Sequence, residues 1–207
     1  MRTLTEQKKN EILTSASSVF LEQGYERASM DGVAKQAGCS KATLYNYFPS
    51  KESLFEAVVR SFSTHYLTRA ADELRSSDNA ALGLTDKLQR FGEGMLGVMM
   101  SDWKALQLYR IVVGEAGHSD IGELFYESGV RESMNALTAV MAHHIENGEL
   151  SGSNAAQRAK QFSALVKAEA DELFLLRKLP VYTQSEVITM VESAVDLFLK
   201  GAGNHRI

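Results

Sequence analysis

The chain has 207 residues, 44% of them hydrophobic and 23% charged, and this composition excludes a disordered or fibrous protein. A single cysteine excludes an internal disulfide and a cysteine-based zinc site, and it suits a reducing compartment. The N-terminal segment is polar, with no apolar signal core, and no run of about 18 apolar residues predicts a membrane span. We therefore expect a cytoplasmic protein that does not contact a membrane.

The net charge of −4 is unevenly distributed along the chain. Residues 1–60 carry eight Lys and Arg against seven Asp and Glu, whereas the remaining residues carry fourteen against nineteen. Local charge decides contact with phosphate groups more than the total does. The acidic total therefore does not exclude nucleic-acid binding by the N-terminal part.

Helical periodicity and the presence of only two prolines predict an all-α protein. In chain order, we expect helices over residues 5–23, 30–37, 41–48, 51–75, 85–100, 103–116, 121–147, 155–179 and 184–200. Gly24 and Gly38 end the first two of these helices, and the residue before Pro49 ends the third. Residues 76–83 are the best candidate for a linker.

The second and third predicted helices are short, and the turn Gly38-Cys39-Ser40 joins them. Gly38 supplies a left-handed conformation, Cys39 is a small apolar plug, and Ser40 caps the following helix. Two short helices joined by such a turn are typical of a helix-turn-helix, whose second helix presents its first residues to base edges in the major groove. The alternative is a structural helix pair in an ordinary bundle.

The third predicted helix carries side chains suited to DNA. Lys41 can donate to guanine O6 or N7, and the small Ala42 lets the backbone approach or contacts a thymine methyl group. Lys51 adds a positive charge at the start of the next helix. Hydroxyl groups suited to phosphate oxygens follow at Thr43, Tyr45 and Tyr47.

The stretch FLEQGYERASMDGVAKQAGCSKATLYNYFPSKESLFEAVV, Phe20 to Val59, resembles the DNA-binding domain of the TetR family of transcriptional repressors. The resemblance rests on the small-residue turn, the Thr-Leu-Tyr-x-Tyr-Phe run at 43–48, and Lys51 after Ser50. It implies phosphate contacts at Ser29, Thr43, Tyr47 and Lys51, and base or groove contacts around Lys41, Ala42, Tyr45 and Asn46. Family members often have Gly or Pro in place of Ala42, so the sequence does not reveal the operator.

The resemblance also implies a division of the chain. Residues 1–52 form the helix-turn-helix DNA-binding domain, and residues 53–207 form a helical domain for effector binding and dimerisation. The segment from Trp103 to Gly129 resembles the C-terminal domain of the AefR-like subgroup. No cofactor is implied.

The predicted helix over 85–100 is rich in glycine and methionine. Glycines allow close approach to the backbone, and methionines fill irregular space, so this helix is either a pliable wall of an effector pocket or a loosely packed core helix. Arg110 also has two interpretations, an effector contact or a structural ion pair with Glu115 or Glu169. Trp103 and Tyr126 are either pocket or core residues. The candidate effector residues are Phe91, Met95, Met99, Trp103, Arg110, Tyr126 and Glu169.

Two histidine motifs raise the question of a metal site, Glu115-x-x-His118 and His143-x-x-Glu146. A di-iron bundle needs two Glu-x-x-His motifs and two further glutamates, and only the first motif has the required order. We therefore expect solvated or capping histidines and no metal.

These observations predict a homodimeric transcriptional repressor that a small, mainly apolar effector releases from a palindromic operator. The helices 155–179 and 184–200 carry apolar residues on more than one face, which favours burial against a twofold mate. A helical-bundle enzyme or metal protein is the alternative, but no nucleophile–base–orienter set is present. A non-specific, nucleoid-type DNA-binding protein is disfavoured by the acidic total. The apolar residues that carry the dimer prediction are Phe162, Leu165, Leu173, Phe174, Leu176, Val187, Val191, Val195 and Leu199.

Overall fold

The computed structural model describes residues 5–63, 69–75 and 81–204, and these residues form helices and connecting loops. A single isolated bridge, between Leu150 and Gly203, is the nearest approach to β structure in the described part of the chain. The all-α prediction is therefore confirmed. Within the same residues, no helix combines the length and the apolar character needed to cross a bilayer.

The chain forms two compact units. Unit 1 comprises residues 1–62 and 107–125, and unit 2 comprises residues 63–106 and 126–207. Each unit has its own hydrophobic core. From the sequence we expect the chain to divide at residue 52 into a DNA-binding part and an effector-binding and dimerisation part. That boundary concerns function, and it stays a prediction.

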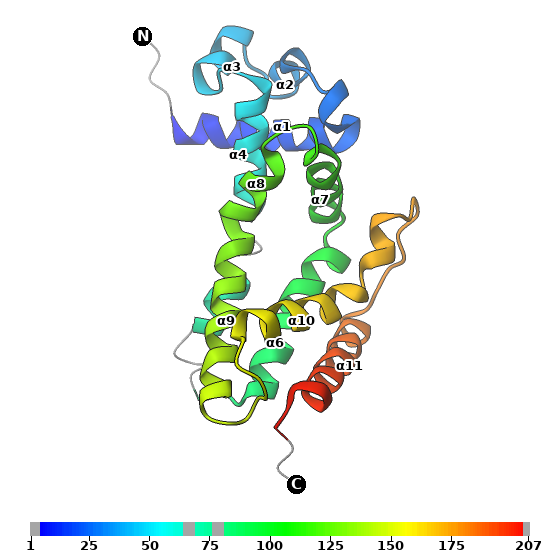
Figure 1. Cartoon of the computed structure of the whole chain (residues 1–207). Helices are drawn as coiled ribbons and strands as arrows, with labels where there is room; N and C mark the ends of the chain where they lie inside the picture. The colour runs from blue at the N-terminus through cyan, green and yellow to red at the C-terminus, as the bar shows by residue number, and fades with distance from the viewer. Residues whose placement is uncertain (1–4, 64–68, 76–80, 205–207) are drawn as a thin grey trace. The chain divides into compact units, whose positions relative to one another are not determined.

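Unit 1 contains the predicted helix-turn-helix. In Figure 1 its α2 and α3 lie together on one side of α1. The core includes Phe20, Phe55 and the third-helix residue Leu44, all fully buried. The rings of Phe20 and Phe55 lie 4.8 Å apart, and that of Tyr25 lies 4.9 Å from Phe55. The helices are α1 (Glu6–Arg27), α2 (Met30–Gln36), α3 (Lys41–Tyr47), α4 (Lys51–Ser63), α7 (Trp103–Glu115), which belongs to this unit from residue 107, and α8 (Ile121–Phe125).

The predicted end of the first helix at Gly24 corresponds to a break in the backbone. Gly24 has φ 77° and ψ 167°, a left-handed φ that favours glycine, and one further turn extends the element to Arg27. The backbone N–H of Ala28 then donates to the Gly24 carbonyl. The glycine therefore redirects the chain before α2.

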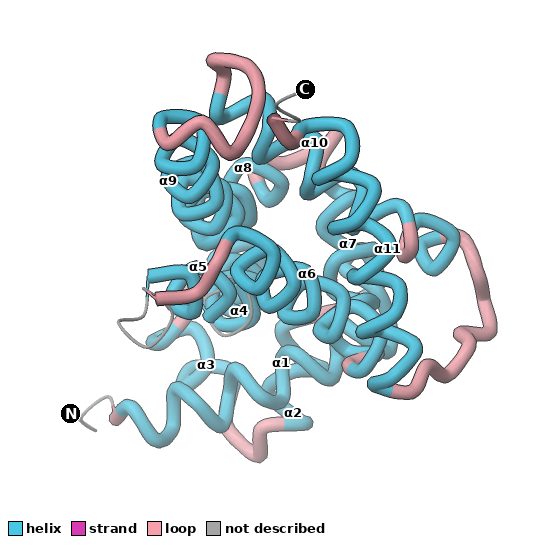
Figure 2. The backbone as a smooth tube through the Cα atoms, turned by 90° about the horizontal axis from the view of Figure 1, so that it is seen from below, coloured by secondary structure: helices cyan, strands magenta, loops and turns pink. Residues whose placement is uncertain are grey.

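Unit 2 is a bundle whose core contains three aromatic rings. Phe162 lies 6.4 Å from Phe91 and 5.3 Å from Phe198, measured between ring centroids. These rings come from α10, α6 and α11, so side chains from three helices fill one core. Figure 2 shows the backbones of these three helices in unit 2. The elements are α5 (Arg69–Arg75), α6 (Leu84–Ser101), the π-helical turn η3 (Tyr126–Val130), α9 (Arg131–Glu146), α10 (Ala155–Ala168), the 3₁₀ turn η4 (Asp171–Phe174) and α11 (Gln184–Ala202).

Two of the predicted helices are wrong in extent. The predicted helix 121–147 is divided by the π-helical turn, because the buried Gly129 leaves helical geometry there. The predicted helix 155–179 ends at Ala168, apart from the short turn η4. Leu175 and Val181 beyond that turn are 88% and 92% exposed, so burial of apolar side chains does not stabilise a continued helix.

Two further expectations fall partly outside the described residues. The predicted helix 51–75 corresponds to α4 and α5, and residues 64–68 between them are not described. Residues 76–80 of the predicted linker are likewise outside the described part of the chain.

Most of the apolar residues that carry the dimer prediction belong to the core of unit 2. Phe162, Val187, Val191 and Val195 are 5% exposed or less. These residues therefore lie on the face that serves the core of unit 2, and the dimer stays a prediction. The exposed large apolar residues of this region are Leu175, Leu176, Val181 and Leu197.

Candidate nucleic-acid interface

The turn between α2 and α3 is held by its own side chains and backbone. Gly38 has φ 57°, as expected for the left-handed position of the turn. The N–H of Cys39 donates to the Ala34 carbonyl over 3.0 Å. Ser29 Oγ accepts from the Gly32 N–H and Ser40 Oγ from the Thr43 N–H, each over 3.1 Å. Ser40 therefore caps α3 as predicted, Ser29 caps α2 in the same way, and the two serines fix the first turns of these helices.

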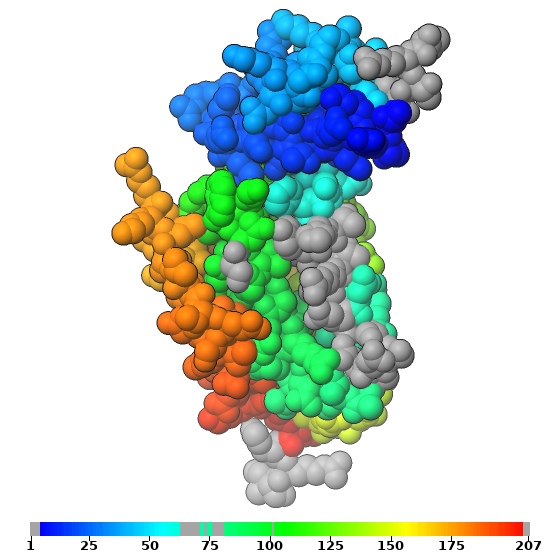
Figure 3. All heavy atoms as spheres, turned by 180° about the vertical axis from the view of Figure 1, so that it is seen from behind, coloured from blue at the N-terminus to red at the C-terminus, as the bar shows by residue number. Residues whose placement is uncertain are grey.

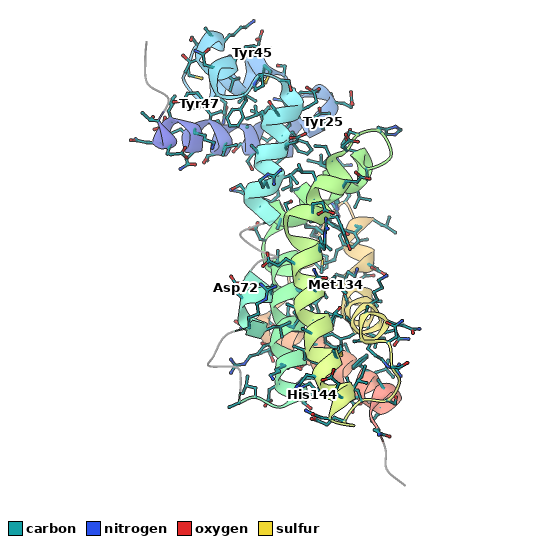
Figure 4. All side chains as sticks on the ribbon, turned by 60° about the vertical axis from the view of Figure 1, so that its left-hand side comes forward. Tyr25, Tyr45, Tyr47, Asp72, Met134 and His144 are labelled. Carbon is teal, nitrogen blue, oxygen red and sulfur yellow. The ribbon has the colours of Figure 1, made fainter. Side chains whose placement is uncertain are left out.

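One side of α3 is anchored in the core and the other is open to solvent. Leu44 is fully buried, whereas Tyr45 is 46% exposed. Thr43 and Tyr47 are half-buried. Figure 4 shows Tyr45 and Tyr47 projecting from α3, with Tyr47 directed toward the start of α1. The predicted DNA contacts on this helix that are exposed to solvent are Lys41, Ala42, Tyr45 and Asn46.

Lys41 forms an ion pair with a residue of the preceding helix. Its Nζ lies 2.5 Å from Asp31 Oδ2, and the two side chains are 64% and 61% exposed. Asp31 lies in the first turn of α2, where a carboxylate interacts favourably with the helix dipole. An exposed ion pair of this kind contributes only about 0.2–1 kcal/mol, so the ammonium group can leave it at small cost.

The Tyr47 hydroxyl connects α3 to the start of α1. It accepts a hydrogen bond of 2.8 Å from the Thr5 backbone N–H. Thr5 is the N-cap of α1, and its own Oγ1 accepts from the Lys8 N–H. A phenol has one proton to donate besides its acceptor sites, so Tyr47 can accept from Thr5 and donate to a phosphate oxygen at the same time.

Lys51 is bound to the end of α1. Its Nζ donates to the Tyr25 carbonyl over 3.0 Å and to the Glu26 carbonyl over 3.3 Å. The same nitrogen lies 4.3 Å from the centroid of the Tyr25 ring. An ammonium group has three N–H donors, and these two bonds use two of them. Lys51 therefore joins α4 to α1 and retains one donor for a phosphate.

Tyr25, whose ring lies next to the Lys51 ammonium group, has a raised pKa. Burial, and then the nearby charge of Glu52, raise the pKa of Tyr25 to about 12. The Tyr25 hydroxyl donates to Glu52 Oε1 over 3.2 Å. The pKa of Glu52 is lowered, first by a hydrogen bond from its own backbone N–H and then by that from Ser50. The neutral phenol and the carboxylate are thus the stable forms at neutral pH.

Sequence reasoning missed three residues that position these groups. Asp31 pairs with Lys41, Thr5 bonds Tyr47, and Lys8 donates from Nζ to the Ala37 carbonyl over 3.0 Å. Asp31 follows the cap Ser29 by two residues, which predicts a role at the helix start but says nothing about a partner ten residues ahead. The other two contacts join residues 42 and 29 positions apart, so no local pattern could reveal them.

Unit 1 also has a hollow of about 780 Å³ between α1 and α2. It touches none of the seven candidate effector residues. The residues around it are mainly polar in type, but their apolar and polar atoms line it about equally: Gln7, Asn10, Glu11, Thr14, Ser15, Gln36 and Ala37.

The candidate effector residues lie in different environments. Phe91 is buried in the core of unit 2, and Met95 and Met99 pack partly buried against it. The Ser163 hydroxyl lies 3.9 Å from Met95 Sδ and adds a polar group to this region. Glu169, at the end of α10, is half-buried.

The other three candidates are more exposed or lie elsewhere. Trp103 is 55% exposed and Tyr126 is 48% exposed, so the alternative interpretation of both as core residues is wrong. Arg110 belongs to unit 1, so the seven candidates do not lie within one unit. The pairing of Arg110 with Glu115 or Glu169 stays a prediction.

The histidines have two kinds of surroundings. His118 and His143 are exposed, and His143 Nε2 lies 3.0 Å from the Asn147 amide nitrogen. His144 is 5% exposed, so our expectation of a solvated or capping histidine is wrong there. Its ring packs inside the bundle at the end of α9, with Nδ1 3.0 Å from Glu149 Oε1 (Figure 4). Among the described residues, no three His, Cys, Asp or Glu side chains gather as metal ligands would.

Comparison with known families agrees with this geometry. Residues 12–58, which contain the helix-turn-helix, match the bacterial regulatory proteins of the tetR family. Residues 86–201 match the C-terminal domain of AefR-like transcriptional repressors. The chain belongs to the TetR family. Its C-terminal part is of the AefR-like type, as the resemblance of residues 103–129 predicts.

Solved TetR-family structures share the fold over almost the whole chain. The flavonoid-responsive regulator FrrA is 31% identical, with a TM-score of 0.75 over 97% of this chain and 100% of its own. A putative TetR-family regulator from Mesorhizobium loti superimposes with a TM-score of 0.83 at 23% identity, covering 98% and 100% of the two chains. FadR from Bacillus subtilis, crystallised with stearoyl-CoA, is 18% identical with a TM-score of 0.71 over 93% and 98%. At these lower identities the likeness concerns the fold alone.

Curated TetR-type relatives match over a shorter region. The activator FasR of Mycolicibacterium smegmatis is 34% identical over 85 residues, which is 41% of this chain and 36% of FasR. The nucleoid occlusion factor SlmA of Pasteurella multocida is 28% identical over 88 residues, 42% of this chain and 44% of SlmA. This chain thus spans less than half the length of these relatives.

Proposed function

We propose that this TetR-family regulator is a homodimeric repressor, which binds a palindromic operator through α3 and which a small, mainly apolar effector releases. It acts as a binding protein, without catalysis, on cytoplasmic DNA. The observation that carries this proposal is α3 itself. Its buried Leu44 fixes the helix to the core, while Lys41, Tyr45 and Asn46 stand in solvent where a major groove can receive them.

The proposed division of labour on this surface follows from the contacts. Lys41 and Asn46 face outward and suit base edges. Tyr47 and Lys51 each retain a donor after their internal bonds, which suits phosphate oxygens. Ser29 and Thr43 lie in the first turns of α2 and α3 and complete the proposed phosphate contacts.

The effector proposal rests on the interior of unit 2. Phe91, Met95 and Met99 offer apolar and polarizable surface, with the Ser163 hydroxyl as a polar group among them. FrrA is flavonoid-responsive, and FadR was crystallised with stearoyl-CoA. Both ligands have large apolar parts, which supports an effector of that character here.

The dimer proposal rests on apolar residues that unit 2 leaves in solvent. Leu197 of α11 is 59% exposed, and the segment after η4 exposes Leu175 and Val181 almost completely. Figure 3 shows this orange segment standing out from the surface of unit 2. A twofold mate would cover such surface and would supply the second recognition helix that a palindrome requires.

The decisive test is selection of bound duplexes from a genomic pool, followed by titration of the selected site and a random duplex at several salt concentrations. We expect tighter, salt-dependent binding of the selected site, with the preference weakened by Lys41→Ala. Equal affinity for both duplexes would favour the nucleoid-type alternative, and bound metal without duplex binding would favour the metal-protein alternative. Sedimentation at micromolar concentration tests the dimer, and a monomer there would contradict it.

The effector is tested on the same duplex. Addition of a flavonoid or of stearoyl-CoA should weaken binding of the selected site if either resembles the natural effector, because a releasing ligand must prefer the non-binding conformation. A polar sugar phosphate serves as the control. Release by the sugar phosphate alone would contradict the apolar effector.

A further inference from the structure

The ion pair between Lys41 and Asp31 places a negative charge on the surface that the proposed function assigns to DNA. Lys41 is the first residue of α3, and Asp31 lies in the first turn of α2. Their charged atoms are 2.5 Å apart, and both side chains are more than half exposed. A carboxylate so close to the Lys41 ammonium group, which we propose contacts a base, is unexpected, because DNA is a polyanion and repels it.

Asp31 is not required for the local fold in the way that the capping residues are. Ser29 already caps α2 through its hydroxyl, and the turn is fixed by Gly38 and by the Cys39–Ala34 backbone bond. Asp31 is exposed and contributes to neither core. Its side chain therefore acts on its surroundings chiefly through its charge and through Lys41.

We propose that Asp31 is a specificity-determining residue of the DNA-binding surface, which neutralises Lys41 and directs its ammonium group away from phosphates until a matching base edge is present. This inference rests on the proposed DNA-binding function. The carboxylate orients one N–H of Lys41 toward itself and leaves two donors, the number that bonds to guanine O6 and N7 require. On a matching site the ammonium group bridges Asp31 and the base.

On a site without that base the same pair is unfavourable. Lys41 alone would turn to the nearest phosphate and would increase affinity for any sequence. Paired with Asp31 it brings no net positive charge, and the carboxylate is repelled by phosphates within the Debye length of about 10 Å at 0.1 M salt. Asp31 therefore weakens binding to random DNA more than binding to the operator.

The test compares Asp31→Asn with wild type on the selected operator and on a random duplex at about 0.1 M salt. Asparagine keeps the shape and removes the charge. We expect affinity for the random duplex to rise about three- to fivefold, as loss of an exposed ion pair allows, and affinity for the operator to stay close to that of wild type, so that the ratio of operator to random affinity falls about threefold or more. The salt slope for random DNA should steepen by about 0.9, as one more phosphate contact predicts.

Three variants separate this role from a general charge effect. Glu22→Gln removes one exposed negative charge from a different helix, α1, and should leave the ratio of operator to random affinity unchanged. Asp31→Glu keeps a carboxylate and should retain a ratio close to that of wild type. In a Lys41→Ala background, Asp31→Asn should no longer steepen the salt slope, because the lysine that it releases is gone.

The outcomes distinguish the two proposals. If Asp31→Asn changes both affinities by the same factor, or if its effect persists without Lys41, Asp31 does not determine specificity and acts only as a surface charge. A lower unfolding midpoint with an unchanged ratio would likewise reduce Asp31 to a stabilising residue of α2. If the wild-type protein binds no duplex at all, the proposed function itself fails, whatever the variants do.

Discussion

The two units differ in how closely their helices approach, although both have polar side chains that bond to the backbone of another helix, in unit 2 from Gln89 Nε2 of α6 to the Ile188 carbonyl of α11 over 3.3 Å. In unit 1, polar side chains join separate helices through backbone groups: Lys8 to Ala37, Lys51 to Tyr25, and Tyr47 to Thr5. In unit 2, α6 approaches α11 so closely that a methyl group at Gly92 would lie 2.5 Å from Val191 Cγ1.

This difference bears on how function can change in each unit. Tyr47 and Lys51 are also proposed phosphate contacts, so in unit 1 the same side chains serve the fold and DNA binding. In unit 2 the close approach depends on the absence of a side chain at residue 92, which is not among the proposed effector contacts. Measurements that separate the two kinds of contact test this comparison.

The largest effect is expected for Lys51→Met, which keeps the apolar stem and removes the ammonium group. The variant loses two hydrogen bonds from a charged donor and a cation–π contact with Tyr25. Hydrogen bonds to charged groups contribute about 1.5–3 kcal/mol each, but Lys51 is only half-buried and solvent screens its charge, so we expect the free energy of unfolding to fall by about 2 kcal/mol in all. Urea denaturation measures it.

Lys35→Met is the matched control for that variant, because Lys35 is an exposed lysine of α2 in the same unit. Its free energy of unfolding should stay within about 0.5 kcal/mol of wild type. Equal stability of the two variants would show that Lys51 serves DNA alone, and the comparison between the units would then fail.

The next effect concerns the helix contact of unit 2. Gly92→Ala places a methyl group against Val191, a fully buried and β-branched side chain that cannot easily turn away. Overpacking costs about 1–3 kcal/mol, and the higher helix propensity of alanine offsets up to about 1 kcal/mol of it. We expect a net loss of about 1–2 kcal/mol in thermal unfolding.

Gly97→Ala in the same helix should have the opposite sign. A methyl group there meets no atom within 4 Å, so only the gain in helix propensity, up to about 1 kcal/mol, remains. If both alanines stabilise the protein, α6 and α11 are not held at close approach, and the account of unit 2 given above is wrong.

A smaller effect is expected for Tyr47→Phe, which removes both the acceptor for the Thr5 N–H and the proposed donor to phosphate. Affinity for operator and random duplex should fall alike, by about fivefold, which corresponds to about 1 kcal/mol. Tyr45→Phe removes a hydroxyl from the same helix and should instead change the ratio of the two affinities. If Tyr47→Phe changed that ratio, Tyr47 would itself contact a base, or it would position another residue that contacts a base.

The local features of the fold could be predicted from the sequence. The glycine at the turn and the serine caps are short-range signals, and the structure has them at Gly38, Ser29 and Ser40. The extent of the C-terminal helices could not be predicted, because it depends on what the chain packs against. Periodicity continued past Ala168, but Leu175 and Val181 find no core there.

The candidate site divides in the same way. That α3 presents a polar face follows from the pattern around Leu44, which alternates buried and exposed positions at helical spacing. The partners of that face come from residues distant in the chain, such as Asp31 for Lys41 and Thr5 for Tyr47. It is harder still to predict from the sequence which candidate effector residues lie close together, because Phe91 and Arg110 belong to different units.

The smallest predicted effect tests whether unit 2 also depends on a polar contact. Thr183 and Glu186 form a capping box at the start of α11: the Glu186 N–H donates to Thr183 Oγ1 over 3.3 Å, and the Thr183 N–H donates to Glu186 Oε2 over 2.7 Å. The hydrogen bond from the Thr183 backbone, and then that from its hydroxyl, lower the pKa of Glu186 from its ordinary value of 4.5.

A carboxylate whose folded-state pKa is lowered stabilises the fold above its unfolded value, and this contribution is lost as the pH falls through the folded pKa. Glu186→Gln keeps the box, since glutamine can accept the same bonds, but it cannot titrate. We therefore expect the variant to lose slightly less stability than wild type as the pH falls below 4.5, measured by urea unfolding at each pH. Glu192→Gln, on the exposed side of α11, is the control. An acid loss in Glu186→Gln equal to that of wild type would mean that the box does not hold α11 in solution, and that this helix is positioned by its contacts with α6, both the close packing at Gly92 and the hydrogen bond from Gln89 Nε2 to the Ile188 carbonyl.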